Sequence, residues 1–113
     1  MNTKPDHLEL SGEEVDAAIS WHGGQSSMLY AVASTGALSR GTIRPYGDDG
    51  PLTDDEWICH LASNLAWEAR DAAKSAGTQY RTAKGKERKE LLKDRWTLIS
   101  MAEKAEELIK LYE

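Results

Sequence analysis

The sequence predicts an all-α fold, in which two short N-terminal helices precede a long C-terminal helical hairpin. Three observations support this: two capping-box motifs, two long apolar repeats of helical period, and a glycine-rich break between the halves. The alternative is an α+β fold, in which a small N-terminal β-hairpin packs on two helices. Because 113 residues suffice for one small core and are too few for two, we predict a single domain over residues 1–113.

The first predicted helix begins at the capping box SGEE, where the Ser11 side chain accepts from the Glu14 backbone and the Glu14 carboxylate reaches back. Residues 1–10 contain a proline and few apolar side chains, so we expect a loose lead-in. We expect Gly23 and Gly24 to end the helix, because glycine accepts the left-handed backbone that follows many helices. The apolar face at helical spacing consists of Val15, Ala18, Ile19 and His22.

The next segment, QSSMLYAVAST at residues 25–35, fits either a helix or a strand. An apolar run this short does not distinguish the two periods. Its alanine, serine and leucine content favours a helix, and Gly36 stands where a glycine commonly follows a helix. We therefore expect a helix here.

The C-terminal half is predicted to be a helical hairpin over residues 54–112. Residues 37–52 ahead of it contain three glycines and two prolines and are expected to form a connector. The capping box TDDE then opens a helix over residues 54–76, which Gly77 is expected to end. After a polar turn, the last helix is expected over residues 86–112.

The apolar arc of the last predicted helix exceeds half of its circumference, whereas a surface helix needs only about 100°. Either the N-terminal helices or another chain must cover this arc, and we predict a homo-oligomer, a dimer or higher. The arc consists of Leu91, Leu92, Trp96, Leu98, Ile99, Met101, Ala102, Ala105, Leu108, Ile109 and Tyr112.

A second face of the helix over residues 54–76 is polar and aromatic. His60, Asn64, Trp67 and Asp71 recur at intervals of four, three and four residues and therefore line up. Such a row suits a stacking and hydrogen-bonding surface for a protein partner. The alternative is that Trp67 belongs to a core formed with the N-terminal helices or a second subunit. Glu68 lies on the apolar arc of this helix. It is either a carboxylate at the edge of that arc or paired with a base of the last helix, or it is a buried acid with a shifted pKa.

The segment WHGGQSS is a candidate anion or phosphate site. If a helix begins there, free backbone N–H groups and two hydroxyls converge, and two arginines downstream supply charge. The alternative is a tight turn between two helices. The candidate ligand-binding residues are Trp21, His22, Gly24, Gln25, Ser26, Ser27, Arg40 and Arg44.

The motifs of common enzyme classes are missing from the sequence. It contains no Walker-type loop, G-x-S-x-G, H-E-x-x-H or EF-hand pattern, so we expect no catalysis, metal or cofactor. The alternative is a small nucleotide hydrolase or transferase that uses His60, Glu68 or Asp71. One cysteine, Cys59, excludes an internal disulfide, and the N-terminus lacks a signal-peptide pattern, so we expect a cytoplasmic protein that does not enter a membrane.

Charge is unevenly placed along the chain. Residues 1–73 carry 12 acids and 4 bases, whereas residues 74–95 carry 8 bases and 3 acids. Such a basic stretch attracts nucleic acid, a phosphorylated ligand or the acidic half of a neighbouring subunit. Binding to duplex DNA is not expected, because the net charge is −5 and no basic stripe follows a whole helix.

Two segments, WHGGQSSMLYAVASTGAL and the later LTDDEW with LAWEARDAA, resemble small uncharacterised proteins of bacteriophages that infect actinobacteria. The resemblance covers residues 15–75 and implies no active site. It implies a non-catalytic modulator that binds and inhibits a host defence or regulatory protein, or that sequesters a nucleotide-like signal as an oligomer. A phage structural protein or assembly chaperone is the further alternative.

Overall fold

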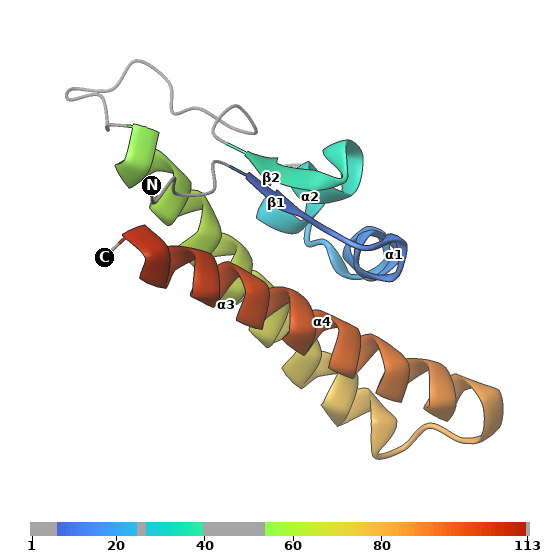
Figure 1. The fold of residues 1–113 in the computed structure, drawn as a ribbon. Helices are drawn as coiled ribbons and strands as arrows, with labels where there is room; N and C mark the ends of the chain where they lie inside the picture. The colour runs from blue at the N-terminus through green and yellow to red at the C-terminus, as the bar shows by residue number, and fades with distance from the viewer. Residues whose placement is uncertain (1–6, 25–26, 40–53, 113) are drawn as a thin grey trace.

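The computed structural model describes residues 7–24, 27–39 and 54–112, which form four helices and two short strands (Figure 1). The two long helices form the predicted antiparallel hairpin, and the all-α prediction is confirmed. In chain order the elements are β1 (His7–Glu9), α1 (Gly12–Trp21), α2 (Met28–Thr35), β2 (Ala37–Ser39), α3 (Asp54–Tyr80) and α4 (Gly85–Tyr112).

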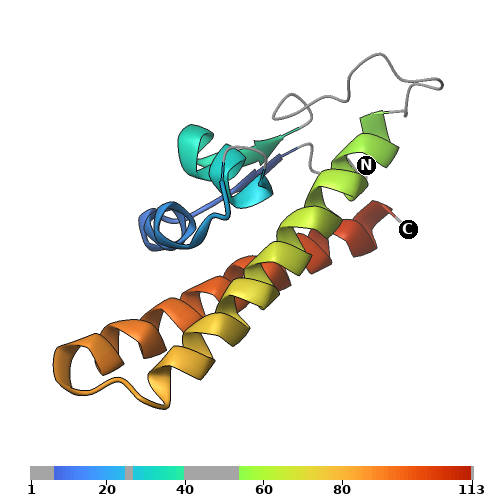
Figure 2. The ribbon, with the colours of Figure 1, turned by 180° about the vertical axis from the view of Figure 1, so that it is seen from behind.

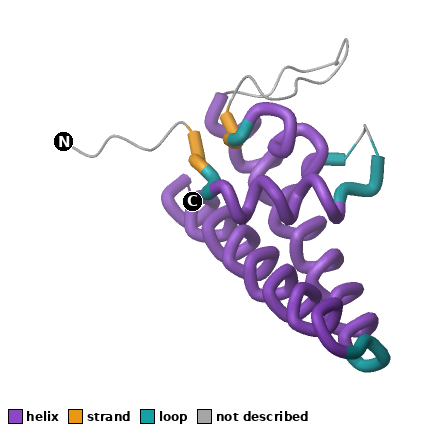
Figure 3. Tube along the Cα trace, turned by 90° about the vertical axis from the view of Figure 1, so that its right-hand side faces the viewer, coloured by secondary structure: helices purple, strands orange, loops and turns teal. Residues whose placement is uncertain are grey.

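The elements are arranged in two layers (Figures 1 and 3). The α3–α4 hairpin forms one layer, and α1, α2 and the two strands lie together on one face of it. Seen from behind, the turn that joins α3 to α4 projects well beyond this N-terminal layer (Figure 2). The N-terminal elements therefore leave the outer part of the hairpin tip uncovered.

The main core lies between the two layers. Leu29 and Val32 of α2 pack there with aliphatic side chains of α3 and α4, and alanines of α3 such as Ala69 allow the two long helices to approach closely. A second, smaller cluster at the hairpin tip contains Ala76, Ala83 and Leu91. The largest fully buried side chains are Leu29, Val32, Leu38, Ile58, Leu61, Leu65, Leu98 and Met101.

The short antiparallel strand pair corrects two predicted boundaries. β1 lies inside the predicted loose lead-in of residues 1–10, and β2 forms the start of the predicted connector of residues 37–52. Leu8 pairs with Leu38, which is fully buried, and Leu8 packs against the same core. Strands of three residues are too short to show a period in the sequence, so their pairing was not predicted.

α3 continues past Gly77, where we predicted its end. The guanidinium Nε of Arg95 in α4 lies 3.5 Å from the position that a Cβ of Gly77 would occupy. Beyond this point Tyr80 packs against the cluster of Ala76, Ala83 and Leu91. These contacts between the helices outweigh the low helix propensity of one glycine.

α1 begins as predicted but ends at Trp21, with His22 in extended backbone as the C-cap rather than a left-handed glycine, and its buried face is also different. The expected apolar residue Ile19 is 53% exposed, whereas Glu14, Ala17 and Ala18 are buried. The face is displaced because the Glu14 carboxylate accepts a hydrogen bond from Lys104 Nζ at 2.7 Å and from Ser100 Oγ at 3.3 Å, both on α4.

Glu14 also completes the predicted capping box. Its Oε1 accepts from the Ser11 backbone N–H at 2.8 Å, and its own N–H donates to Ser11 Oγ at 3.2 Å. Burial alone raises the pKa of Glu14, but the hydrogen bonds from Lys104 and Ser11 outweigh it, so this pKa lies below its usual value. Glu14 is therefore a charged anchor that attaches α1 to α4.

Acid should weaken this anchor. Because the folded-state pKa of Glu14 is depressed, its contribution is complete above the unfolded-state value near 4.5 and is lost as pH falls through the folded pKa. Between about pH 5 and pH 3 we expect the free energy of unfolding to decrease more steeply for the wild type than for Glu14→Gln. Urea unfolding followed by circular dichroism measures both slopes, and equal slopes would contradict the prediction.

Gly36 and Gly23 form a matched pair for testing backbone conformation. Gly36 ends α2 with a φ of +79°, whereas Gly23 has no positive φ, and a Cβ at either position would meet no neighbour within 4 Å. We expect Gly36→Ala to lower the free energy of unfolding by about 1 kcal/mol, the usual cost of left-handed backbone in a residue with a Cβ. Thermal and urea unfolding should show almost no change for Gly23→Ala.

Candidate functional site

The end of α1, the start of α2 and the middle of α3 enclose a hollow of about 410 Å³. Two of its residues, Trp21 and Ser27, come from the predicted anion site, and two others, Trp67 and Asp71, come from the predicted partner face. The structure therefore brings together parts of two sites that we predicted separately. The lining consists of Trp21, Gly23, Ser27, Leu29, Trp67, Glu68, Asp71, Ala72 and Ser75.

The N-terminus of α2 is bonded to a carboxylate of the protein itself. Glu68 Oε2 accepts from the Met28 N–H at 2.9 Å, and Glu68 Oε1 accepts from the Leu29 N–H at 3.0 Å. Ser27 Oγ accepts from the Tyr30 N–H at 3.0 Å and is the N-cap. Glu68 thus occupies the position at a helix N-terminus where an anion would bind.

The predicted anion site loses these backbone donors to Glu68. Its remaining members Gln25, Ser26, Arg40 and Arg44 lie outside the described residues, so anion binding through them stays a prediction. The sequence did not predict that Glu68 accepts hydrogen bonds from the N-terminus of α2. The 40 residues that separate Glu68 from Met28 explain why no local pattern indicated the contact.

Trp21 and His22 have structural partners. The Trp21 indole N–H donates to Asp94 Oδ2 at 3.0 Å and ties the end of α1 to α4. The His22 ring packs edge-on against Tyr30 with 5.2 Å between ring centroids, and its Nδ1 accepts from the Gly24 N–H at 3.3 Å. Gly24 has a φ of +125°, as a glycine turn after α1 requires.

The predicted partner face of α3 is exposed, but its residues divide into two pairs. Trp67 and Asp71 line the hollow, and the Trp67 side chain is 70% exposed. His60 instead stacks on Trp57 with 5.5 Å between centroids, and its Nε2 lies 3.4 Å from Asn64 Nδ2. The N-terminal helices therefore do not bury Trp67. Burial of Trp67 by a second subunit stays a prediction.

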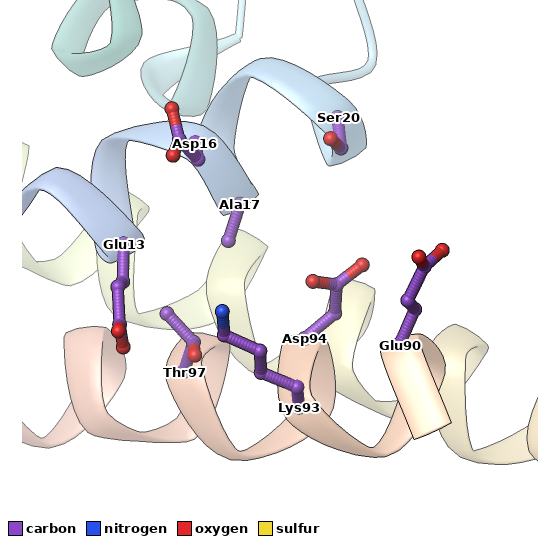
Figure 4. Close-up of a pocket in the computed structure, with 8 residues that line it drawn as sticks. All are labelled: Glu13, Asp16, Ala17, Ser20, Glu90, Lys93, Asp94 and Thr97. Carbon is purple, nitrogen blue, oxygen red and sulfur yellow. The ribbon is translucent and has the colours of Figure 1, made fainter. Parts of the chain in front are cut away.

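A second hollow, of about 310 Å³, lies between α1 and α4 (Figure 4). Glu13 of α1 extends toward α4, and Asp16 of α1 and the carboxylates Glu90 and Asp94 of α4 complete the acidic lining, with Lys93 between Glu13 and Asp94. Among residues 7–24, 27–39 and 54–112, no group of three or more histidine, cysteine or acidic side chains could hold a metal ion. The sequence did not indicate this acidic groove, because each carboxylate occupies an ordinary surface position on its helix.

The first hollow offers surfaces for binding rather than an arrangement for catalysis. Two indole rings and aliphatic side chains line it, together with the carboxylate of Asp71. The candidates for the alternative enzyme are not brought together, because Glu68 is bonded to α2 and His60 does not line the hollow. The arrangement suits an apolar, aromatic or basic side chain.

Comparisons with known proteins give no match. No protein-family model matches the chain, and neither the curated proteins nor the solved structures provide a similar one. None of the described helices is both long enough and apolar enough to cross a membrane.

Removing the Glu68 carboxylate should loosen α2. Glu68→Ala leaves the Met28 and Leu29 N–H groups without their bonds, and we expect it to lower the free energy of unfolding by about 2 kcal/mol. Glu68→Gln keeps one acceptor and should cost about half as much. The exposed neighbour Asp71→Ala is the control and should unfold like the wild type in urea. Equal stability of Glu68→Ala and Asp71→Ala would contradict the capping role.

Proposed function

We propose that the protein is a non-catalytic binding protein whose partner is another protein, held at Trp67 and the hollow beside it. The observation that supports this is the 70% exposure of Trp67 at the rim of a hollow that a second tryptophan, Trp21, also lines. Large indole side chains that are exposed beside a pocket are typical of the residues that dominate the binding energy of interfaces.

A protein partner fits this site better than a phosphorylated ligand does. The backbone donors of α2 are bonded to Glu68, and the described lining carries two carboxylates and no basic side chain. A phosphate would meet like charge there, whereas an aromatic or basic side chain would meet indole rings and Asp71. Sequestration of a nucleotide depends instead on Arg40 and Arg44.

The resemblance to actinobacteriophage proteins supplies the biological role in this proposal. The protein acts as a phage-type modulator in the host cytoplasm, where it binds and inhibits a defence or regulatory protein. Self-association as a dimer or higher oligomer belongs to the same proposal. In the structure, α1, β1 and α3 cover much of the apolar arc of α4, while Trp96 of this arc stays exposed.

Trp67→Ala tests the proposed interface. We expect a host protein that is captured from an actinobacterial lysate by the immobilised wild type to bind this variant about thirtyfold more weakly, equivalent to about 2 kcal/mol. Trp96→Ala is the matched control, because Trp96 is 60% exposed on α4 and does not line the hollow. Trp96→Ala should retain the partner, and both variants should melt within a few degrees of the wild type.

Two outcomes would contradict the proposal. If Trp67→Ala unfolds the protein or keeps the partner as well as the wild type does, Trp67 is not an interface anchor. A thermal-shift panel of mono-, di- and cyclic nucleotides tests the other alternative, since a ligand at about 100 times its Kd adds about 2.7 kcal/mol. Stabilisation by a nucleotide, without a captured protein, would favour sequestration instead.

A further inference from the structure

The side of the hairpin tip that faces away from the N-terminal layer is basic. On α3, the residues that line the first hollow include Glu68, Ala72 and Ser75. Positions two residues beyond these three lie about 200° around the helix, whereas Trp67, which borders the same hollow, is only about 20° around the helix from Lys74. This rear row of α3 consists of Arg70, Lys74, Gly77 and Arg81.

α4 provides a parallel rear row by the same geometry. Glu90, Asp94 and Thr97 line the groove with α1, so residues displaced from them by two positions lie on the far side (Figure 4). This rear row of α4 consists of Arg88, Leu92, Arg95 and Ile99.

Contacts between side chains show that the two rows are neighbours. Arg95 of α4 lies over Gly77 of α3. The guanidinium carbon of Arg88 in α4 is 4.3 Å from the centre of the Tyr80 ring in α3. Arg70 of α3 donates two hydrogen bonds to Glu106 of α4, at 2.6 and 2.7 Å.

Four of the bases in residues 74–95 are therefore on a different side of the hairpin from Glu90 and Asp94, whereas Lys93 lies with these two acids in the groove. Glu90 and Asp94 line the groove beside α1, whereas Lys74, Arg81 and Arg88 belong to the rear rows. Lys74, Arg81, Arg88 and Arg95 are all exposed, and within the described residues none of these four forms an ion pair. This side has a nearly uniform positive sign.

Two aromatic rings accompany these charges. Tyr80 is partly buried and lies under the Arg88 guanidinium, whereas Trp96 is 60% exposed with its ring centre 5.7 Å from the guanidinium carbon of Arg95, so Trp96 is the exposed ring of the two. Exposed aromatic rings among cationic side chains are the arrangement with which proteins bind single strands, stacking bases while the cations follow the phosphates.

We propose that this surface, the tip platform of Lys74, Arg81, Arg88, Arg95 and Trp96, binds single-stranded nucleic acid. Phosphates of one sign match a face of uniform charge, whereas a protein partner usually presents both signs. Stacking on Trp96 requires an unpaired base, which a duplex does not offer. The tip platform shares no residue with the hollow at Trp67, so it is a separate site.

Anisotropy of labelled 12-nucleotide oligo-dT and oligo-U, in about 50 to 200 mM salt, tests the proposal. With four basic contacts we expect a slope of log affinity against log salt of about −3, since each neutralised phosphate contributes about 0.7. The double variant Arg88→Gln, Arg95→Gln should reduce the slope by about 1.4 and weaken binding at least tenfold. Lys110→Gln changes a base on α4 outside the tip platform and should leave affinity within about twofold.

Stacking is tested separately with the two exposed tryptophans. Trp96→Ala should weaken binding of the single strands about tenfold, whereas Trp67→Ala should bind them like the wild type. For the protein partner we expect the reverse, because Trp67→Ala should weaken its binding and Trp96→Ala should not. The two proposals can therefore fail independently.

Four results would overturn the proposal: no binding at 50 mM salt, unchanged affinity of the Arg88 and Arg95 double variant, equal or tighter binding of a 12-bp duplex, or equal binding of polyglutamate. The last would indicate an acidic protein partner instead. If circular dichroism shows that the double variant fails to fold, Lys74→Gln with Arg81→Gln applies the same test at two exposed side chains that form no ion pair within the described residues.

Discussion

The pair of hydrogen bonds from the start of α2 to the carboxylate of Glu68 determines how the N-terminal layer sits on the hairpin. The negative charge lies at the positive end of a short helix and satisfies two of its unpaired N–H groups. Glu14 performs the equivalent task between α1 and α4. Because α2 is held on α3 in this way, Trp21 and Ser27 come to lie beside Trp67, and the hollow exists.

Features that depend on neighbours in the chain were predictable, and those that depend on distant contacts were not. The Ser11 capping box, the helix that Gly36 ends and the long hairpin all follow from patterns within a few residues. The burial of Glu14 requires Lys104, 90 residues away, and the continuation of α3 through Gly77 requires α4. Helix propensity is a property of the local sequence and does not indicate contacts between residues that are far apart in the chain.

The candidate sites show the same division. The four-residue spacing correctly placed Trp67 and Asp71 on an exposed face, but it did not show that Trp21 would meet them. The basic character of residues 74–95 was plain from composition. The sequence did not show that Lys74, Arg81 and Arg88 lie away from Glu90 and Asp94. That separation follows from the fold, because α1 packs on the side of α4 that carries Glu90 and Asp94.

Trp21 is half-buried and packs against both the main core and the small cluster of Ala76, Ala83 and Leu91. That cluster has few members, so the tip should open locally at a lower free energy than the whole protein. Trp21 also lines the hollow, so this one side chain connects the small cluster at the tip, the main core and one wall of the hollow.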